Sequence, residues 1–290
     1  MNFVAQHKLL PGIEPQQVYV MYESFYQLQT NPFSLAPDPT FCFSHSGHRQ
    51  AREYLEYALK LGEGMVMVTG RPGTGKTTLA ETFLSTLNMG PVRAARIAAS
   101  SLDADELLRA ITHAFDIEAE HDDRATLRHC IRQFFEKVLQ SGRRALLIID
   151  EAQGLPRAAL DELRLLADLQ SGSQQLLQLF LIGQEQLREQ LSDPEMEYFQ
   201  QRVIANYHLV SLGLPECRDY VEYRLRQAGW QGDPELTGAA VLDIYRFSKG
   251  VPRNINKLCN RLLLFGYGVG SHILDSDDVQ TIVKEMDAEQ

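Results

Sequence analysis

The stretch that decides the fold runs from Met65 to Thr78 and reads MVMVTGRPGTGKTT. The apolar run over 65–69, followed by glycine, predicts a short buried strand. The rest of the stretch matches the pattern GxxxxGK[ST] in full, and a helical pattern over 77–87 follows it. A loop of this pattern between a strand and a helix is typical of a phosphate-binding site.

Each position of the loop has a chemical reason. Gly73 and Gly75 let the backbone curl so that successive N–H groups point inward at a phosphate. The helix that begins near Lys76 adds the positive end of its dipole. We expect Lys76 to reach the β- and γ-phosphates, Thr77 to place its hydroxyl on Mg²⁺, and Thr78 to lie beside the α-phosphate. The predicted nucleotide-binding residues are therefore Gly70, Arg71, Pro72, Gly73, Thr74, Gly75, Lys76, Thr77 and Thr78.

An acidic pair follows a second apolar run, and its first member lies 74 residues after Lys76. The run over 145–149 reads ALLII and predicts a strand buried on both faces. At its end we expect Asp150 to hold the Mg²⁺ shell. Glu151 is predicted to polarise an attacking water as the general base, and Gln153 to orient the loop.

Three more polar residues are candidates for catalysis. Gln184 follows the apolar run LFLIG and is predicted near the γ-phosphate; the alternative is an amide that faces solvent at a helix start. Arg202, in FQQRV, is a candidate arginine finger for a neighbouring subunit, and Arg253, in GVPRNIN, is a candidate to fold back onto the phosphates. The alternative for both is an ordinary surface arginine. The predicted catalytic residues are thus Glu151, Gln184, Arg202 and Arg253.

The pattern along the chain predicts an α/β fold followed by helices. Strands are expected over 65–69, 92–98, 145–149, 176–182 and 207–212, and helices over 49–61, 77–87, 103–115, 124–139 and 156–169, the last with Pro156 at its first helical position. Apolar strands that alternate with helices indicate a parallel sheet covered on both faces. After Gly213 the strands are expected to stop, and helices are predicted over 215–228, 234–248, 252–265 and 275–287.

We therefore expect an N-terminal extension over 1–20, a nucleotide-binding α/β domain over 21–212 and a small all-helical domain over 213–290. Three prolines over 32–40 predict an ordered loop, and residues 31–43 are expected to frame the adenine pocket.

The amino-acid composition disfavours several classes of protein. Twenty-eight basic and 38 acidic residues give a net charge of −10, which disfavours a protein that coats nucleic acid electrostatically. The four cysteines form no CxxC pair, so a zinc knuckle has no support and a reducing compartment is expected. No apolar run reaches the roughly 18 residues of a membrane span, and the first residues lack the apolar centre of a signal peptide. We predict a cytoplasmic location, with peripheral association at the inner membrane as the variant.

Several ordered motifs resemble AAA+ ATPases of the general secretion pathway protein A type. They are the phosphate loop, DEAQ over 150–153, LIGQ over 181–184 and GVPRNIN over 250–256. Within that group, a second set resembles the ATPases associated with exosortase (PEP-CTERM) and exopolysaccharide loci: MYESFY over 21–26, NPFSLAPDP over 31–39, EME over 195–197, RVIANYH over 202–208 and RLLLFG over 261–266. The resemblance covers about residues 21–285.

The resemblance implies a P-loop NTPase sheet of the AAA+ type with a helical lid domain, ATP and Mg²⁺ as cofactors, and nucleotide-dependent homo-oligomers. It also implies that Asp150 holds the metal, that Glu151 activates water, and that Gln184 and Arg253 are sensors 1 and 2. Gly154 and Pro72 depart from the family pattern without removing a group that the chemistry needs. Relatives often continue into a membrane span and a peptidoglycan-binding domain after the ATPase. This sequence shows neither after its ATPase motifs, so direct engagement of the cell wall is not expected.

The leading hypothesis is a cytosolic Mg-dependent ATPase that assembles or regulates a cell-envelope secretion, protein-sorting or exopolysaccharide export system, with components of that machinery as partners. The alternative is a DNA-associated ATP switch that resembles transposition target-selection ATPases. A third hypothesis is a nucleotide-stabilised scaffold that barely hydrolyses.

Overall fold

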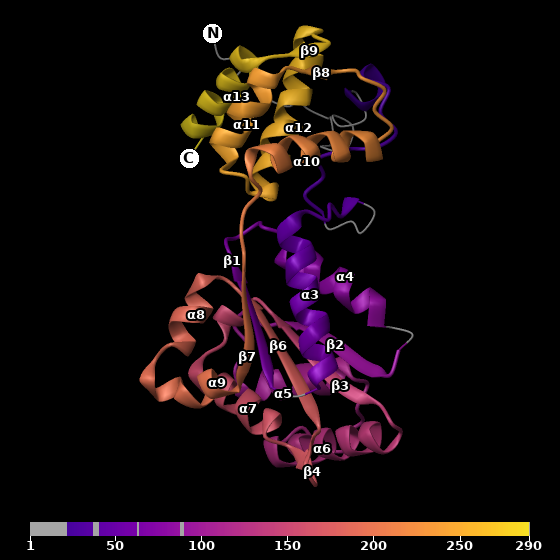
Figure 1. The fold of residues 1–290 in the computed structure, drawn as a ribbon, viewed down its shortest axis with the longest axis vertical. Coiled ribbons are helices and arrows are strands. Elements are labelled where there is room, and N and C mark those ends of the chain that lie inside the picture. Colours follow the sequence, from indigo (N-terminus) through magenta and orange to yellow (C-terminus); the bar gives the residue numbers. More distant parts are fainter. Residues whose placement is uncertain (1–21, 37–40, 63, 88–89, 290) are drawn as a thin grey trace. The chain divides into compact units, whose positions relative to one another are not determined.

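The computed structural model describes residues 22–36, 41–62, 64–87 and 90–289. These residues form two compact units (Figure 1). The sheet unit comprises the described residues within 46–210, and the helical unit comprises the described residues up to His45 together with those from Ser211 onward. Each unit has hydrophobic core clusters of its own and is described by itself.

A five-stranded parallel sheet forms the centre of the sheet unit (Figure 1). Its strands lie in the order β2-β3-β6-β1-β7. Their bounds are β1 (Met65–Gly70), β2 (Val92–Ala98), β3 (Arg144–Asp150), β6 (Leu177–Gly183) and β7 (Val203–Leu209). Because all the strands run in one direction, their carboxyl ends meet at one edge of the sheet. This architecture confirms the predicted fold class.

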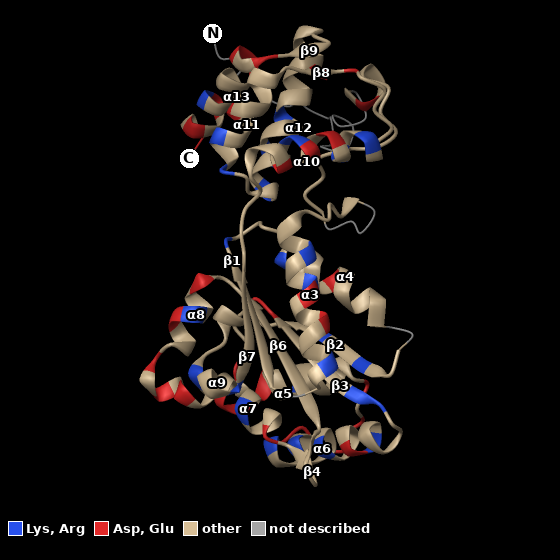
Figure 2. Ribbon diagram, viewed as in Figure 1, with Lys and Arg blue, Asp and Glu red and all other residues tan. Residues whose placement is uncertain are grey.

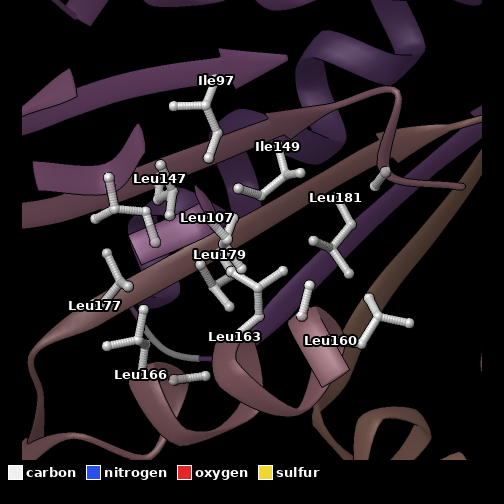
Figure 3. Close-up of a cluster of buried hydrophobic side chains, with 14 of the residues drawn as sticks. Ile97, Leu107, Leu147, Ile149, Leu160, Leu163, Leu166, Leu177, Leu179 and Leu181 are labelled. Atoms are coloured by element: carbon white, nitrogen blue, oxygen red, sulfur yellow. The ribbon is translucent and has the colours of Figure 1, made fainter. Parts of the chain in front are cut away.

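Helices cover both faces of the sheet. They are α3 (Ser46–Leu61), α4 (Lys76–Leu87), α5 (Ala104–Ala114), α6 (Arg124–Gln140), α7 (Arg157–Ala167), α8 (Glu185–Leu191) and α9 (Glu197–Arg202). On one face Leu147 and Leu179 pack against leucines of α5 and α7 (Figure 3). On the other face Leu146 and Ile148 join a cluster with residues of α3 and α4. Successive residues of β3 thus face different cores, which explains why this strand is apolar at every central position.

Capping residues set the helix starts. The Asp103 carboxylate accepts the backbone N–H groups of Asp105 and Glu106, each at 2.8 Å, and Asp123 caps α6 in the same way. Pro156 precedes α7 and does not open it, because its ψ of 160° is extended backbone. The prediction of Pro156 as the first helical residue was therefore one position early.

The sequence analysis predicted the last strand of the sheet over 207–212, whereas β7, an edge strand, runs over Val203–Leu209. Side chains along Val203–Leu209 alternate between half-buried and exposed. Asn206 and His208 therefore face outward, and a search for a continuous apolar run does not find this strand. The short antiparallel hairpin of β4 (Gln170–Ser171) and β5 (Gln174–Gln175), and the helices α8 and α9, were likewise not predicted.

The helical unit contains α10 (Leu214–Gln227), α11 (Gly238–Ser248), α12 (Pro252–Val269) and α13 (Ser276–Ala288). The expectation that strands stop after Gly213 was wrong, because β8 (Glu235–Leu236) pairs in parallel with β9 (Ile273–Leu274). This pairing also explains why the helix predicted over 234–248 begins only at Gly238, after its Thr237 N-cap.

The N-terminal segment groups with the helical unit, whereas the sequence assigned it to the α/β domain. The Tyr22 hydroxyl donates to Asn260 Oδ1 at 2.8 Å, and the Tyr26 hydroxyl donates to the Ser271 carbonyl at 3.0 Å. Both rings are buried in the core of this unit. The physical reason is that these aromatic side chains find their apolar partners about 240 residues away, a contact with no local signal. The extension predicted over 1–20 lies outside the described residues.

Charged residues of both signs are interspersed on the helices of both units (Figure 2). Some pair within one helix, as Arg52 does with Glu56 on α3 and Arg132 with Glu136 on α6. Among the described residues, no helix is both long enough and apolar enough to cross a membrane.

Candidate nucleotide-binding site

The phosphate loop connects β1 to α4 at the carboxyl edge of the sheet. Gly73 and Gly75 have φ values of +81° and +93°, in the left-handed region that favours glycine. A Cβ at position 75 would also lie 2.9 Å from Nε2 of His48 on α3, and one at Gly70 would lie 2.7 Å from the Leu209 carbonyl oxygen. The loop therefore approaches α3 and β7 so closely at these two positions that a side chain there would force a shift.

Lys76 lies inside the curl of the loop. Its Nζ donates to the carbonyl oxygens of Gly70 and Arg71, each at 3.0 Å, and its side chain is buried. Burial lowers the pKa of the Lys76 ammonium from its ordinary value, while the carboxylates of Glu151 and Asp150 oppose that shift. The ammonium group is therefore held against the first two residues of the loop by their carbonyl oxygens.

The acidic pair lies at the end of β3. The Asp150 carboxylate is 2% exposed, and its Oδ1 accepts the backbone N–H of Glu151 at 3.0 Å. Its Oδ2 accepts from the guanidinium of Arg96 on β2, also at 3.0 Å. Glu151 itself adopts a left-handed conformation, with φ of +55° and ψ of +37°. Such a conformation is costly for a residue with a side chain, and it turns the chain sharply after the strand.

Two glutamines hold the Glu151 carboxylate. Its Oε2 accepts the side-chain amide of Gln153 at 2.5 Å and that of Gln184, from the end of β6, at 3.3 Å. Gln153 Oε1 in turn accepts the backbone N–H of Gln184 at 2.9 Å. A Cβ at Gly183 would come within 2.8 Å of the same Gln153 oxygen, so a side chain there would displace the Gln153 amide. The ends of β3 and β6 are thus joined through one side-chain network.

The oxygen donors at this edge fit a divalent cation. Thr77 is in the first turn of α4, and its hydroxyl and the Asp150 carboxylate are hard oxygen donors of the kind that Mg²⁺ takes. Within the part of the chain that the structure describes, no group of three or more His, Cys, Asp or Glu side chains is placed to hold a metal ion. Two protein oxygens suit an ion that takes its other ligands from phosphate and water.

The sequence of this region matches a known family. Residues 59–191 match the model described as AAA domain, a range that contains the phosphate loop, Asp150, Glu151 and Gln184. Over these residues the chain is similar to AAA domains. It is also related to general secretion pathway protein A of Aeromonas hydrophila, with 36% identity over 267 residues, which are 92% of this chain and 48% of that protein. The chain thus spans about half the length of the curated relative that it matches.

Solved structures share the fold over most of the chain. ORC2 of Aeropyrum pernix has a TM-score of 0.62 at 19% identity and covers 88% of this chain, which matches 71% of that protein. Cdc6p of Pyrobaculum aerophilum has a TM-score of 0.65 at 15% identity, with 86% and 71% covered. The RuvB Holliday junction branch migration motor of Thermotoga maritima has a TM-score of 0.52 at 21% identity, with 83% and 68% covered. At these identities the likeness shows the fold alone.

The structure brings the loop residues, Asp150, Glu151 and Gln184 to one edge of the sheet, but it does not bring Arg202 there. Arg202 precedes β7, whose first residue, Val203, pairs with Met65 at the start of β1. The phosphate loop follows the other end of β1, roughly 17 Å away at about 3.3 Å per strand residue.

Arg202 is held by its own neighbours at this amino edge. Its guanidinium donates to Asp168 Oδ1 at 2.6 Å and lies 5.2 Å from the centre of the Tyr198 ring. The Tyr198 hydroxyl also donates to Asp168. A role for Arg202 in a neighbouring subunit's site stays a prediction, and its position away from the phosphate loop of its own chain is compatible with it.

Arg253 belongs to the helical unit, where it is exposed in the first turn of α12. Its predicted action on the phosphates stays a prediction. The segment expected to frame the adenine pocket is also part of this unit: Arg224 donates to the carbonyl oxygens of Pro32 and Ser34 at 2.5 and 3.1 Å. Positions 37–40 of that segment lie outside the described residues.

Arg96 and Glu81 were missed by the sequence interpretation. Side chains alternate along β2, so Arg96 lies on the same face of the strand as Val92 and Ala94. Those two residues pack in the core on the α4 side of the sheet. A charged residue at such a position needs a partner, and this was the signal that could have identified it. Gly154 was noted only as a departure from a family pattern. A Cβ there would lie 2.8 Å from the Ala99 carbonyl oxygen, which explains the glycine.

Proposed function

We propose that this chain binds ATP at the carboxyl edge of its sheet and hydrolyses it with Mg²⁺. The observation that carries the proposal is the meeting of Lys76, Asp150, Glu151 and Gln184 at the ends of three parallel strands within an AAA domain. A phosphate loop alone supports binding. A buried carboxylate beside a second carboxylate whose orientation is fixed supports hydrolysis.

Each residue has one role in this proposal. Lys76 and the backbone N–H groups of the loop over 70–78, except at Pro72, hold the phosphates. Thr77 and Asp150 would hold Mg²⁺, which supplies charge neutralisation at the phosphate oxygens when bound. Glu151 takes a proton from the attacking water, and the amides of Gln153 and Gln184 keep its carboxylate in one orientation.

The helical unit and a second subunit complete the proposed site. Arg253 would approach the phosphates from the helical unit, and Arg202 would act in the site of a neighbouring copy in a nucleotide-dependent homo-oligomer. In enzymes that use an arginine finger, the arginine stabilises the charge of the transition state and raises the rate of hydrolysis by about 10³–10⁵-fold.

The relative suggests the setting. Because the Aeromonas hydrophila protein is named for the general secretion pathway, we propose that this chain assembles or regulates a cell-envelope secretion or export system from the cytoplasmic side. The motifs over 195–208 and 261–266 favour an exosortase- or exopolysaccharide-associated version of that role. The components of the machinery are the proposed partners.

The test is release of inorganic phosphate from Mg-ATP by the wild-type chain and by Glu151→Gln. We expect the variant to hydrolyse about 10²–10⁴-fold more slowly, because general-base catalysis is worth that much, and to bind ATP with unchanged affinity. The matched control is Glu189→Gln, which removes an exposed carboxylate from α8 and should turn over like the wild type.

Three outcomes would each contradict a part of the proposal. Equal turnover by Glu151→Gln and the wild type would remove the general-base assignment. Absence of turnover at any protein concentration would favour a nucleotide-stabilised scaffold. A rate stimulated by duplex DNA, with stimulation that weakens as salt is raised, would favour a DNA-associated switch over the secretion role.

A further inference from the structure

Arg96 lies on β2, the edge strand beside β3 (Figure 1). In the register of this pair Arg96 is opposite Ile148, two residues before Asp150. Since side chains alternate along a strand, Arg96, Ile148 and Asp150 share the face of the sheet that α4 covers. The arginine side chain is 27% exposed and lies beside the apolar Ile148 and the carboxylate of Asp150.

The guanidinium of Arg96 bridges two carboxylates. Its NH1 contacts Asp150 Oδ2 and its NH2 contacts Glu81 Oε1, both at 3.0 Å. The Asp150 carboxylate is 2% exposed and that of Glu81 is 33% exposed. Because the Asp150 carboxylate is so buried, its charge needs a cationic partner, and the guanidinium is the cation that hydrogen-bonds to it directly.

The second carboxylate links this bridge to the phosphate loop. Glu81 lies four residues after Thr77 on α4, so the two residues lie on the same face of the helix, one turn apart. Arg96 therefore connects the helix that carries Thr77 to the strand end that carries Asp150. These are the two residues that offer oxygen ligands for Mg²⁺.

A divalent cation that bound to Asp150 would compete with the guanidinium of Arg96 for the same carboxylate. Asp150 Oδ2 already accepts from a full positive charge, and a divalent ion bound to Asp150 would lie within a few ångströms of that guanidinium. Like charges at such a separation repel strongly in a partly buried site. The negative charge of nucleotide phosphates, which would bring further ligands for the ion, reverses this balance.

We propose that Arg96 is a positioning residue that ties Asp150 to Glu81 and keeps the Asp150 carboxylate from binding a divalent cation in the absence of nucleotide. The cation then enters together with the nucleotide phosphates. This inference rests on the proposed function, because it takes the Asp150 edge as the place where Mg²⁺ and the nucleotide meet.

The direct test measures Mn²⁺ binding to the nucleotide-free protein by calorimetry. We expect Arg96→Gln to bind Mn²⁺ about tenfold more tightly than the wild type, because a unit positive charge near the ion is removed. The matched control is Arg93→Gln, on the same strand, whose partner Asp116 is on the surface. It removes the same charge and should leave the Mn²⁺ affinity unchanged.

A second measurement reports on the same contact through stability. Without Arg96 the buried Asp150 carboxylate lacks its cationic partner, so the melting temperature of Arg96→Gln should fall in EDTA. Addition of Mn²⁺ should raise the melting temperature of Arg96→Gln by more than it raises the melting temperature of the wild type. Both effects should vanish in Asp150→Asn/Arg96→Gln, where no carboxylate remains to bind the ion. If Arg96→Gln fails to fold, Arg96→Lys keeps the charge but loses the two-armed bridge, and should show a smaller gain in Mn²⁺ affinity.

Equal Mn²⁺ affinities for the wild type and Arg96→Gln would overturn the proposal. An equal gain in Arg93→Gln would also overturn it, because the effect would then come from net charge. Failure of the proposed function is seen separately, as a wild-type chain that does not bind a fluorescent ATP analogue with Mg²⁺ present. The nucleotide-free measurements do not depend on that result.

Discussion

The two edges of the sheet hold their polar residues in different ways. At the carboxyl edge, Lys76 is fixed by backbone carbonyl oxygens and Glu151 by two side-chain amides. At the amino edge, Arg202 is fixed by one ion pair with Asp168 and by the face of Tyr198, and its side chain is 30% exposed.

The difference shows which chemistry is complete within one chain. At the carboxyl edge the polar groups are buried or bonded to groups of the same edge, as expected of a preorganised site. The side chains of the Arg202–Asp168 pair are each 30% exposed, and an ion pair in contact with water contributes less to stability than a fully buried one, so the arginine can exchange this partner for another. Arg202 is thus suited to a contact made only in an assembly.

Arg202→Ala gives the largest effect expected at the amino edge. We predict that its maximal hydrolysis rate falls by about 10³-fold or more, because the finger charge is lost, while ATP affinity is unchanged. The measurement is specific activity against protein concentration, which should rise and then saturate for the wild type.

A mixing experiment distinguishes a shared site from a folding defect. Arg202→Ala keeps an intact Glu151, and Glu151→Gln keeps an intact Arg202. If a site takes its arginine from a neighbour, an equal mixture of these two inactive proteins regains activity. An inactive mixture, with both variants folded and binding ATP, would show that Arg202 is not shared between subunits.

Gln153→Leu tests the side-chain network at the carboxyl edge, and we expect a smaller loss of turnover than for Arg202→Ala. Loss of its amide frees the Glu151 carboxylate and removes the acceptor of the Gln184 N–H. We expect a decrease in turnover of about tenfold to a hundredfold at unchanged ATP affinity, since a misplaced catalytic group costs about that much. Gln133→Leu, an exposed substitution on α6, is the control. Unchanged turnover in Gln153→Leu would show that Gln184 alone orients Glu151.

Local patterns predicted the carboxyl edge well. The phosphate loop, β1 and α4 follow one another directly, and β3 carries Asp150 at its end, so a strand–loop–helix reading was sufficient. The five-stranded sheet followed from the alternation of apolar strands with helices, which the order β2-β3-β6-β1-β7 confirms.

What the sequence did not predict depends on distant contacts. The bridge from Arg96 to Asp150 joins residues 54 positions apart, and that from Arg224 to Pro32 joins residues 192 apart. Neither arginine belongs to a local motif. The edge strand β7 was misplaced for a related reason. Every second side chain of this strand is exposed, so its sequence lacks the continuous apolar run by which a strand such as β3 was found.

The most direct test of the nucleotide site is hydrogen exchange of backbone amides with and without Mg-ATP. Dilute wild-type protein is predicted to gain protection over residues 70–78 and 150–153 and to show no change over 198–203. Lys76→Ala should gain none, because the charge at the centre of the loop is gone. Protection by Mg-ATP that spares residues 70–78 would contradict the account, since the nucleotide would then bind elsewhere.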